Sequence, residues 1–497
     1  MRNNGSLSRP PHGSSYPGTL RRRLLKGLGA NSIGQVLILS SRVLLAPLFL
    51  RAWGADAYGT WLLLSSFVAY LALMDMGGQL YIVNRLTQAY AEQDFALFRK
   101  VLHTGLAAFL IMPTAVFLLF IAALSSVPSD LFLPASSKTD DTIVVWVLAI
   151  LAFQFLFSLP LGILLGTYRA VGLLPRGTML HNLVFFLQLI FTVGALWLGG
   201  GMVWIASMET LPFLLVATFA AGEINKRFPQ FGLLSLKEAD YSTALTFIKP
   251  SLHFFSIQVA YLFSIQGMVL IVGAVLAPLQ VVIFSTIRTM VAAMRQLLGF
   301  ITLSAWPELT RLDVEQETDK LFVMFRTIIR STLVVAAVII VTLYFFGGTI
   351  YRLWLGGTVV YQQTIMDLFL VYAFELVFWT ACSHLLMAIN KHHALAKVVL
   401  GSSVLMITLA YLGGQYFGLR GIVAGMIASD LLLPFWLVPY LVNRYQRRFS
   451  MRFFLTELAP IIGSLISAVF MPWLTPFILL LLFAWWASSI RSMTILE

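Results

Sequence analysis

The sequence is poor in cysteine and in charge. Its single cysteine, Cys382, lies in an apolar run, which excludes an intrachain disulfide, a CxxC redox pair and a zinc site built from several cysteines. Charged residues make up only 11% of the 497 residues, whereas 59% are hydrophobic. The mean hydropathy of +0.88 exceeds that of ordinary soluble domains. The composition therefore predicts a membrane protein.

Signatures of nucleotide and metal chemistry are also missing. The sequence has no GxxxxGK[ST] motif that would bind a nucleotide phosphate, and no HExxH motif that would bind zinc. The pair His392-His393 follows Lys391 in a segment that we expect to be a solvated loop. We therefore expect no metal site, no cofactor and no direct coupling to ATP.

The chain is basic, with 33 Lys and Arg against 21 Asp and Glu and a formal net charge of +12. Most basic residues occupy alternate loops between apolar segments and form no stripe interleaved with aromatic residues, so we expect no nucleic-acid partner. With the N-terminus inside, the outer loops contain only Arg51, Lys138, Arg352 and Arg420. This positive-inside bias predicts that both termini are cytoplasmic.

About fourteen mostly apolar segments of roughly 18 to 25 residues follow one another, each long enough to cross a bilayer as a helix. They are expected at residues 28–50, 60–82, 101–125, 143–166, 178–198, 202–221, 248–273, 280–304, 331–348, 364–388, 396–413, 419–440, 457–472 and 474–490. Because a bilayer excludes lipid-exposed loops and sheet edges, these segments predict an all-α polytopic membrane protein.

The two halves of the chain resemble each other at an offset of roughly 220 residues. Gly201-Met202-Val203 matches Gly421-Ile422-Val423, and in each following helix an acid, Glu209 or Asp430, precedes a proline. The repeat predicts two six-helix bundles with two appended helices. The expected boundaries are a disordered tail at 1–27, bundles at 28–221 and 248–440, a cytoplasmic linker at 222–247, and the appended helices with a short tail at 441–497.

Three arginines lie deep within expected spans. Arg42 is well inside the first span, and Arg288 and Arg295 are seven residues apart on the span at 280–304, which places them on one helix face. A charged side chain at such depth rarely faces lipid, so we expect these arginines to line a cavity and to bind an anionic substrate. The alternative is that each arginine joins helices by pairing with an acid or a carbonyl.

Other polar residues within the spans are further candidates for substrate binding. Lys249 lies near a helix end, where its side chain could instead reach the membrane surface. Amide and hydroxyl groups could hydrogen-bond a glycan or bond across helices, and those selected are Asn31, Gln35, Gln258, Tyr261 and Gln266.

Five acids also fall within the spans. They are Asp75, Glu209, Asp367, Glu375 and Asp430. An intramembrane acid can bind a proton or Na⁺, and because no nucleotide motif is present we expect transport driven by such an ion. The alternative for Glu209 and Asp430 is structural, since the prolines that follow them open the helix and leave backbone groups to be bridged.

Several short segments between residues 20 and 450 resemble the Wzx-type polysaccharide and O-antigen flippases of the multidrug, oligosaccharidyl-lipid and polysaccharide (MOP) exporter superfamily. The segments are Leu50-Arg51-Ala52-Trp53-Gly54 with Tyr58-Gly59, Met74-Asp75-Met76-Gly77-Gly78, Val83-Asn84-Arg85, Gly166-Thr167-Tyr168-Arg169-Ala170-Val171-Gly172, Phe284-Ser285-Thr286-Ile287-Arg288 and Trp306-Pro307-Glu308-Leu309. The chain departs from the family at Phe284, where a tyrosine is frequent.

The resemblance implies a transporter and not an enzyme. The two bundles would form a V around a central cavity and carry undecaprenyl-pyrophosphate-linked oligosaccharide from the inner to the outer leaflet of the bacterial cytoplasmic (inner) membrane. Transport would follow alternating access coupled to H⁺ or Na⁺. Membrane lipids and polysaccharide polymerase or chain-length proteins would be partners.

Other functions are compatible with the same segments. A multidrug or cation antiporter and a lipid II flippase would share the fold, although deep arginines favour an anionic substrate over cationic drugs. A polysaccharide polymerase or ligase would need a sizeable outer loop with catalytic groups, and the longest one, 126–142, has neither His nor Arg. A scaffold without transport activity would have a closed cavity.

Overall fold

The computed structural model describes most of the chain, and every regular element in its described part is helical. The described residues are 20–75, 77–124, 126, 139–233, 236–245, 247, 258–259, 262–389, 391–446 and 448–494. The first half contains α1 (Leu20–Val68), the 3-10 turn η1 (Ala69–Asp75), α2 (Gly78–Ala91), α3 (Phe95–Leu124), α4 (Asp141–Ala170), α5 (Leu174–Trp197), α6 (Met202–Arg227) and η3 (Pro229–Phe231). The second half contains the π-helical turn η4 (Phe263–Gly267), α8 (Met268–Val275), α9 (Pro278–Val314), α10 (Thr318–Leu355), α11 (Gln363–Ala388), α12 (His392–Leu432), α13 (Pro434–Tyr445), α14 (Met451–Phe470), η5 (Pro472–Leu474) and α15 (Thr475–Thr494).

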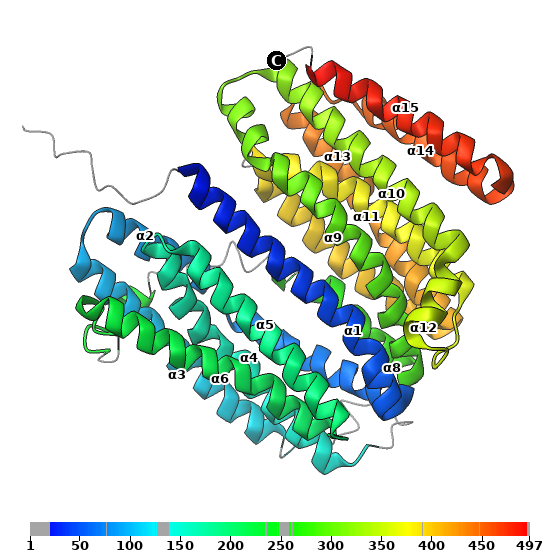
Figure 1. The fold of residues 1–497 in the computed structure, drawn as a ribbon. Helices are drawn as coiled ribbons and strands as arrows, with labels where there is room; N and C mark the ends of the chain where they lie inside the picture. The colour runs from blue at the N-terminus through cyan, green and yellow to red at the C-terminus, as the bar shows by residue number, and fades with distance from the viewer. Residues whose placement is uncertain are drawn as a thin grey trace, which may run out of the picture.

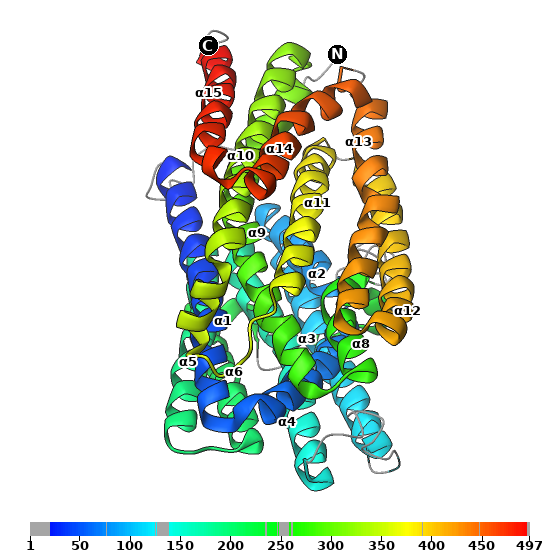
Figure 2. The same cartoon turned by 90° about the vertical axis from the view of Figure 1, so that its right-hand side faces the viewer.

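These helices form two lobes (Figure 1). The N-lobe consists of α1 to α6 and the C-lobe of η4 to α13, while α14 and α15 pack against α10 at the outer side of the C-lobe, as Figure 2 also shows. Helix α1 lies between the lobes and packs against both α5 and α9. The expected fold class, an all-α polytopic membrane protein with two bundles and two appended helices, is confirmed.

Two glycines divide the longest helices. Gly54 has a φ of 77° inside α1, and Gly418 has a φ of 60° inside α12, a left-handed backbone conformation that glycine adopts without strain. Each break lies between two consecutive expected spans, so α1 and α12 each contain parts of two of those spans. Every expected span contains helix in its described part.

Several helix boundaries differ from the expected ones. Helix α1 begins at Leu20, inside the expected tail, and α6 continues to Arg227, so the segment between the lobes starts at residue 228. The second expected span is not a single helix, because η1 and the left-handed Gly77 interrupt it. Helix α10 begins at Thr318 instead of residue 331. Hydropathy detects only the apolar part of a helix, so polar turns beyond that part are missed.

Corresponding helices of the two lobes begin at a nearly constant offset of about 220 residues. The first residues pair as Phe95 of α3 with Thr318 of α10, Asp141 of α4 with Gln363 of α11, and Leu174 of α5 with His392 of α12. The internal repeat that the sequence predicted is therefore present in the arrangement of helices.

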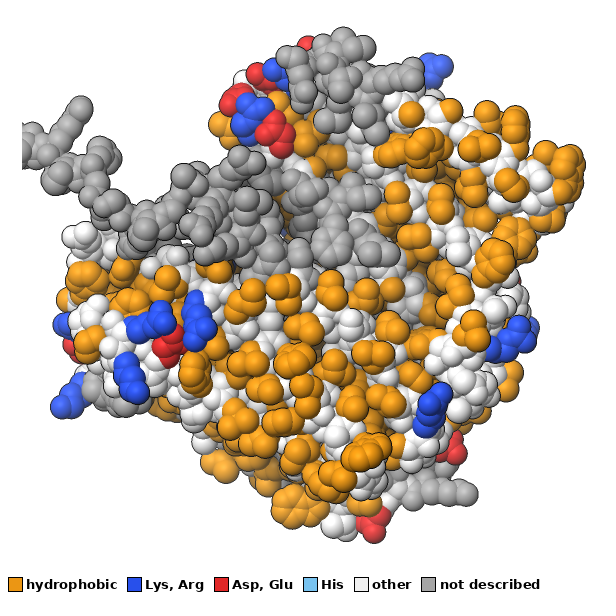
Figure 3. All heavy atoms as spheres, in the orientation of Figure 1, with side chains coloured by type: hydrophobic (Ala, Val, Ile, Leu, Met, Phe, Trp, Pro, Cys, Tyr) orange, Lys and Arg blue, Asp and Glu red, His pale blue; other side chains and the backbone are white. Residues whose placement is uncertain are grey.

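The outer surface is strongly apolar. Nine helical segments of the described chain are long and apolar enough to cross a membrane. On α3, Ile111 and Leu119 are 70% and 71% exposed, which would be unfavourable in water. In Figure 3 hydrophobic side chains cover a broad band, and the charged side chains gather toward its edges. The chain is therefore a multi-pass membrane protein.

The two ends of the lobes differ in how their cores are built. One end carries Arg227 and Arg311 and is called the basic end below. At the basic end the described residues form a separate core in each lobe, one that includes Phe98 in the N-lobe and one that includes Phe325 in the C-lobe. Among the described residues, the two lobes therefore do not share an apolar core at the basic end.

The other end, called the opposite end below, carries the glycine breaks at Gly54 and Gly418. Here one core runs through both lobes, joining Leu50 of α1 and Leu148 of α4 to Tyr351 of α10. The lobes are thus packed together at the opposite end, and this shared core closes that end of the molecule.

Candidate functional site

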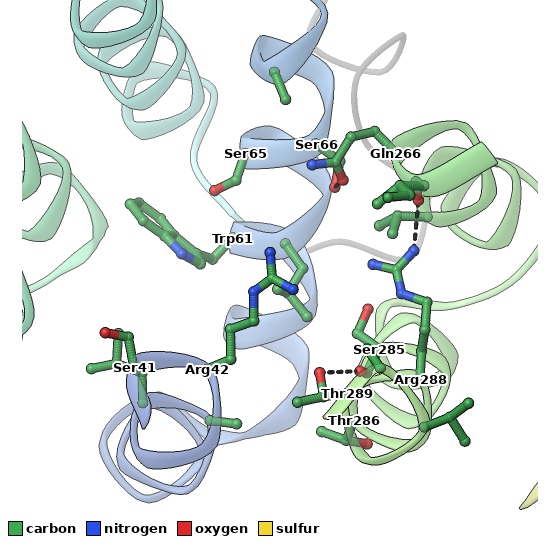
Figure 4. Close-up of a pocket in the computed structure, with 18 of the residues that line it drawn as sticks. Ser41, Arg42, Trp61, Ser65, Ser66, Gln266, Ser285, Thr286, Arg288 and Thr289 are labelled. Carbon is green, nitrogen blue, oxygen red and sulfur yellow. Dashed lines mark hydrogen bonds between the residues drawn. The ribbon is translucent and has the colours of Figure 1, made fainter. Parts of the chain in front are cut away.

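A cavity of about 490 Å³ lies between the lobes and is lined by residues of α1, α9, η4 and their neighbours. Arg42 enters it from α1, and Arg288 and Arg295 enter it from α9. Figure 4 shows the Arg42 and Arg288 side chains reaching into the same space from two helices. The structure therefore brings together the three arginines that the sequence singled out, while their role as substrate ligands stays a prediction.

Two of these arginines are available to a ligand. Within the described part of the chain, neither Arg42 nor Arg295 forms an ion pair or a hydrogen bond with another residue. Arg42 is exposed to the open space of the cavity. A guanidinium placed so deep in an apolar helix is stabilised only if water or an anion contacts it. Among the described residues, the positive charges of Arg42 and Arg295 thus have no bonded partner, and both side chains line the cavity.

Arg288 is held more firmly. Its Nη1 donates a hydrogen bond of 2.6 Å to the carbonyl of Ile265, and its guanidinium lies 5.3 Å from the centre of the Phe284 ring. Ile265 belongs to the π-helical turn η4, an irregularity of the backbone that often marks a functional site. The expected alternative, an arginine that pairs with a backbone carbonyl, is therefore observed here in a residue that also lines the cavity.

Small hydroxyl side chains and one amide form the polar wall of the cavity. Ser65 and Ser66 lie on the segment of α1 after Gly54, and the Ser66 hydroxyl donates to Gln266 Oε1 at 3.2 Å. On α9 the wall contains Ser285 and Thr289. Of these residues the sequence reasoning selected only Gln266. The sequence offers only a weak signal for the others, namely that Trp61 and Ser65 are four residues apart and so lie on one helix face.

Aromatic rings close the cavity toward the opposite end. Phe49 stacks on Tyr58 with ring centroids 5.2 Å apart, and Trp53 and Trp61 meet edge to face at 5.8 Å. Phe49, Tyr58 and Trp61 line the cavity. The turn at Gly54 brings these residues together, because it folds the second segment of α1 back beside the first. The cluster forms the floor of the site.

The acids at equivalent positions of the repeat have different surroundings. Glu209 on α6 lines the cavity. Asp430 on α12 is buried and accepts hydrogen bonds from Trp379 Nε1 at 2.9 Å and from the Ser402 hydroxyl at 3.3 Å. Glu375 on α11 is also buried, and its Oε2 has no hydrogen-bond partner among the described residues. The C-lobe therefore holds two buried carboxyl groups beside the cavity wall formed by Tyr372.

The other two intramembrane acids are not among the residues that line the cavity. The Asp75 carboxylate accepts a hydrogen bond of 3.0 Å from the backbone N–H of Gln79 and so caps the start of α2. Asp367 accepts a hydrogen bond of 2.7 Å from Gln363 Nε2 in the first turns of α11. Both contacts are local to a helix end, which gives these two acids a structural explanation.

The remaining candidates are scattered. Gln35 joins α1 to α9 through a hydrogen bond of 2.6 Å from Gln296, and Gln258 donates to the Ala72 carbonyl at 3.5 Å. Neither lines the cavity in the described part of the chain. The side chain of Asn31 and the residues Lys249 and Tyr261 lie outside the described residues.

No protein-family model and no curated protein matches the sequence. The structure, in contrast, is similar to solved structures. An inward-facing multidrug resistance MATE family transporter of the MOP superfamily matches with a TM-score of 0.69 at 14% identity, covering 85% of this chain and 98% of that chain. An outward-facing conformation of a MATE family transporter matches with a TM-score of 0.58, also at 14% identity, covering 87% and 97%.

A second kind of protein has the same arrangement of helices. The lipid II flippase MurJ, in an inward closed conformation, matches with a TM-score of 0.68 at 14% identity, covering 95% of this chain and 100% of that chain. The chain therefore has the fold shared by MATE transporters and MurJ. These structural neighbours are transporters and a flippase, and not enzymes.

Proposed function

We propose that this protein is a flippase that moves undecaprenyl-pyrophosphate-linked oligosaccharide from the inner to the outer leaflet of the bacterial cytoplasmic membrane. The observation that carries the proposal is the convergence of Arg42, Arg288 and Arg295 on one cavity between the lobes. A diphosphate that leaves water needs cationic partners, and guanidinium groups bind phosphate oxygens through two parallel hydrogen bonds.

The remaining lining of the cavity suits the sugar next to the diphosphate. Ser65, Ser66 and Gln266 offer hydroxyl and amide groups, and Trp61 offers an aromatic face. A volume of about 490 Å³ is within the range of small-molecule sites, so the cavity would hold the diphosphate and the first sugars. The rest of the glycan would extend toward the basic end, where each lobe has its own core.

The direction of transport follows from the distribution of charge. The positive-inside rule assigns the basic end to the cytoplasm, where lipid-linked oligosaccharides are assembled. The shared core closes the other end of the cavity. Substrate would enter from the cytoplasmic side, and the lobes would then separate at the opposite end to release it. Membrane lipids would surround both lobes, and polymerase or chain-length proteins would receive the product.

Glu209, Glu375 and Asp430 are the acids that we assign to coupling with H⁺ or Na⁺. Glu209 faces the cavity, and Glu375 and Asp430 are buried in the C-lobe near Tyr372. Whether a buried carboxyl group is charged or has bound a cation depends strongly on its surroundings. Alternating access would alter those surroundings.

A multidrug antiporter is the second candidate, because MATE transporters have the same fold. A site for cationic drugs needs negative charge, whereas the described lining of this cavity contains three arginines and the single acid Glu209. This balance favours an anionic substrate. A lipid II flippase would use the same diphosphate chemistry, so only the glycan distinguishes it from the proposed function.

Proteoliposomes provide the test. Purified protein is reconstituted with undecaprenyl-pyrophosphate-linked oligosaccharide, and the glycan that reaches the far leaflet is measured with an impermeant lectin. Arg42→Ala and Arg288→Ala should remain monodisperse and lose transport by about tenfold or more, since each removes a charge-assisted contact. Arg85→Ala is the matched control, because Arg85 is a half-buried residue of α2 that does not line the cavity and that donates only to Gln88 in the described chain.

The same preparation separates the alternatives. Transport of lipid II in preference to the oligosaccharide lipid would assign the protein to peptidoglycan synthesis. Uptake of a cationic dye without transport of either lipid would identify a multidrug antiporter. Normal lipid transport by both well-folded alanine variants would refute the assignment of the phosphates to these arginines.

A further inference from the structure

Helix α1 contains a backbone carbonyl that its own helix cannot satisfy. Pro47 lies inside α1 and has no N–H, so the carbonyl of Val43, four residues earlier, lacks the donor that an α-helix would provide. In the structure the Nε1–H of Trp354 donates to this carbonyl at 2.6 Å. The proline and the indole therefore form a matched pair, in which one residue frees the acceptor and the other occupies it.

The two partners belong to different lobes. Val43 and Pro47 lie on α1, whereas Trp354 lies in the last turn of α10 in the C-lobe. The segment of α1 before the break at Gly54 is joined to the rest of the N-lobe by another indole, since Trp53 Nε1 donates to the carbonyl of Gly200 between α5 and α6 at 2.9 Å. Separation of the lobes at the opposite end would therefore have to break the Trp354 bond, while the Trp53 bond could persist.

A short chain of contacts connects Trp354 to the cavity. Its ring packs edge to face on Tyr351, with centroids 6.3 Å apart. The buried Tyr351 hydroxyl shares a hydrogen bond of 2.9 Å with the hydroxyl of Thr286, which lines the cavity on α9 two residues before Arg288. A ligand that displaces Arg288 would therefore act on the same packed group of side chains that positions the indole.

The corresponding segment of the C-lobe also has a backbone carbonyl that accepts a hydrogen bond from a side chain, but there the donor belongs to the same lobe. The π-helical turn η4 lies about 220 residues after the Val43–Pro47 turn, and its Ile265 carbonyl accepts a hydrogen bond from Arg288. Both repeats thus interrupt the ladder of hydrogen bonds at matching places and satisfy a carbonyl with a side chain. Only in α1 does the donor come from the other lobe.

We propose that the hydrogen bond from the Trp354 indole to the Val43 carbonyl is a latch that holds the opposite end of the cavity closed and breaks when the lobes separate there. The inference rests on the proposed function in one respect, namely that transport requires such separation. The carbonyl has a partner in both states, because the indole occupies it when the lobes are closed and water can reach it when they open. Such an arrangement favours closure without making it irreversible.

Two substitutions remove the latch by different routes. Trp354→Phe keeps an aromatic ring on Tyr351 but has no N–H to donate. Pro47→Ala restores an N–H inside α1 that can donate to the Val43 carbonyl. The hydrogen bond from the Trp354 indole then no longer stabilises the closed arrangement. Trp197→Phe is the matched control, because Trp197 is 87% exposed at the same end of the N-lobe.

The test measures the distance between the lobes and needs no substrate. Spin labels are attached at Leu198→Cys and Phe417→Cys in a Cys382→Ser background, both at exposed positions of the opposite end, and the distance distribution is recorded in nanodiscs. Loss of one hydrogen bond should raise the population of the longer distance about fivefold in Trp354→Phe and in Pro47→Ala, and leave Trp197→Phe unchanged.

Distance distributions identical to that of the parent in both variants, with the helical content and monodispersity of the parent, would overturn the latch. A change in Trp354→Phe alone would also count against it, because the proposal requires the same effect when the carbonyl finds a donor in its own helix. The distance distributions are recorded without a transported substrate. An error in the flippase assignment would therefore not change them, and the two proposals can fail separately.

Discussion

Ser66 and Gln266 share a hydrogen bond of 3.2 Å that joins the N-lobe to the C-lobe within the wall of the cavity. Ser66 lies on α1 after the break at Gly54, and Gln266 lies in the π-helical turn η4. Together with the contact between Trp354 and Val43, this bond shows that α1 touches the C-lobe through specific polar groups. The cavity is therefore a joint product of both repeats, and its shape depends on how they are docked.

The contributions that the charge and the planar shape of the Arg42 side chain make to transport should be separable. Arg42→Lys keeps the charge but loses the planar pair of donors, so transport should fall between that of the parent and that of Arg42→Ala. The measurement is initial flux in proteoliposomes at matched protein content. A lysine variant as inactive as the alanine variant would mean that geometry alone matters, and full activity of both would contradict a phosphate contact.

The buried acids of the C-lobe should govern ion coupling. Glu375→Gln should be tolerated by the fold, since an oxygen of this side chain has no hydrogen-bond partner in the described chain. Flux in this variant should become less sensitive to an imposed H⁺ or Na⁺ gradient, because the amide cannot bind and release the ion. Asp367→Asn is the control, as Asp367 bonds only Gln363 in the described chain, near the start of α11. Equal gradient dependence in both variants would contradict the assignment.

The docking of the appended helices onto the C-lobe should depend on Glu457. Its side chain is 2% exposed and pairs with Arg326 at 2.9 Å and Arg330 at 2.6 Å, which docks α14 onto α10. Glu457→Gln leaves two arginines without a counter-charge, one of them buried, and should lower stability by about 3–5 kcal/mol. Thermal unfolding and proteolysis between α13 and α14 measure the loss.

An exposed acid provides the control for Glu457. Glu308 pairs with Arg311 on the surface of α9, where an ion pair contributes about 0–1 kcal/mol. Glu308→Gln should therefore leave the unfolding temperature nearly unchanged. Equal shifts in the two variants would show that the pairing of Glu457 does not stabilise the docked helices.

The segment between the lobes should loosen at low pH. Hydrogen bonds from Ser242 and Thr243 and a 2.9 Å contact with Lys100 hold the pKa of the Asp240 carboxyl well below its usual range. A depressed pKa stabilises docking at every pH above the unfolded value of about 4. This contribution declines as the pH falls below that value toward the folded pKa.

Hydrogen exchange of residues 236–245 measures this docking. Protection, corrected for the intrinsic rate at each pH, should stay constant above pH of about 5 and fall below it. Asp240→Asn should show reduced protection already at neutral pH. Protection that is independent of both pH and this substitution would rule out a role for the Asp240 charge.

The basic end should face the cytoplasm. Tyr241 is 78% exposed at that end, so a cysteine placed there in a Cys382→Ser background is available to a thiol reagent. We expect no labelling by an impermeant reagent in intact cells and strong labelling after permeabilisation. Leu198→Cys at the opposite end should behave in the reverse way. Labelling of the cysteine at position 241 in intact cells would invert the topology.

The sequence predicted the helices well because a bilayer imposes one requirement on every span, a long apolar stretch. It also indicated Arg42 and Arg288, since a deep arginine is rare enough to be informative on its own. Serine and tryptophan carry no such signal. Ser65 and Trp61 are common in membrane helices, and only the packing of α1 against the C-lobe shows that they line the cavity.

Irregular backbone was the other feature that hydropathy could not reveal. The 3-10 turn before α2 and the π-helical turn at Phe263–Gly267 both lie within apolar segments that read as continuous helix. Their position is determined by tertiary contacts, such as the hydrogen bond that Arg288 donates to Ile265. The acids divide in the same way, because Asp75 and Glu209 look alike in sequence, whereas one caps a helix and the other faces the cavity.

The single core at the opposite end has a thermal consequence. Separation of the lobes there would expose to water apolar side chains such as Phe49 and Val272, which are almost completely buried. Hydration of apolar surface raises the heat capacity, and the preference for burying that surface weakens on cooling. The balance between the closed and the separated arrangement should therefore shift toward separation as the temperature falls, so that cold, and not heat, would favour the rarer state.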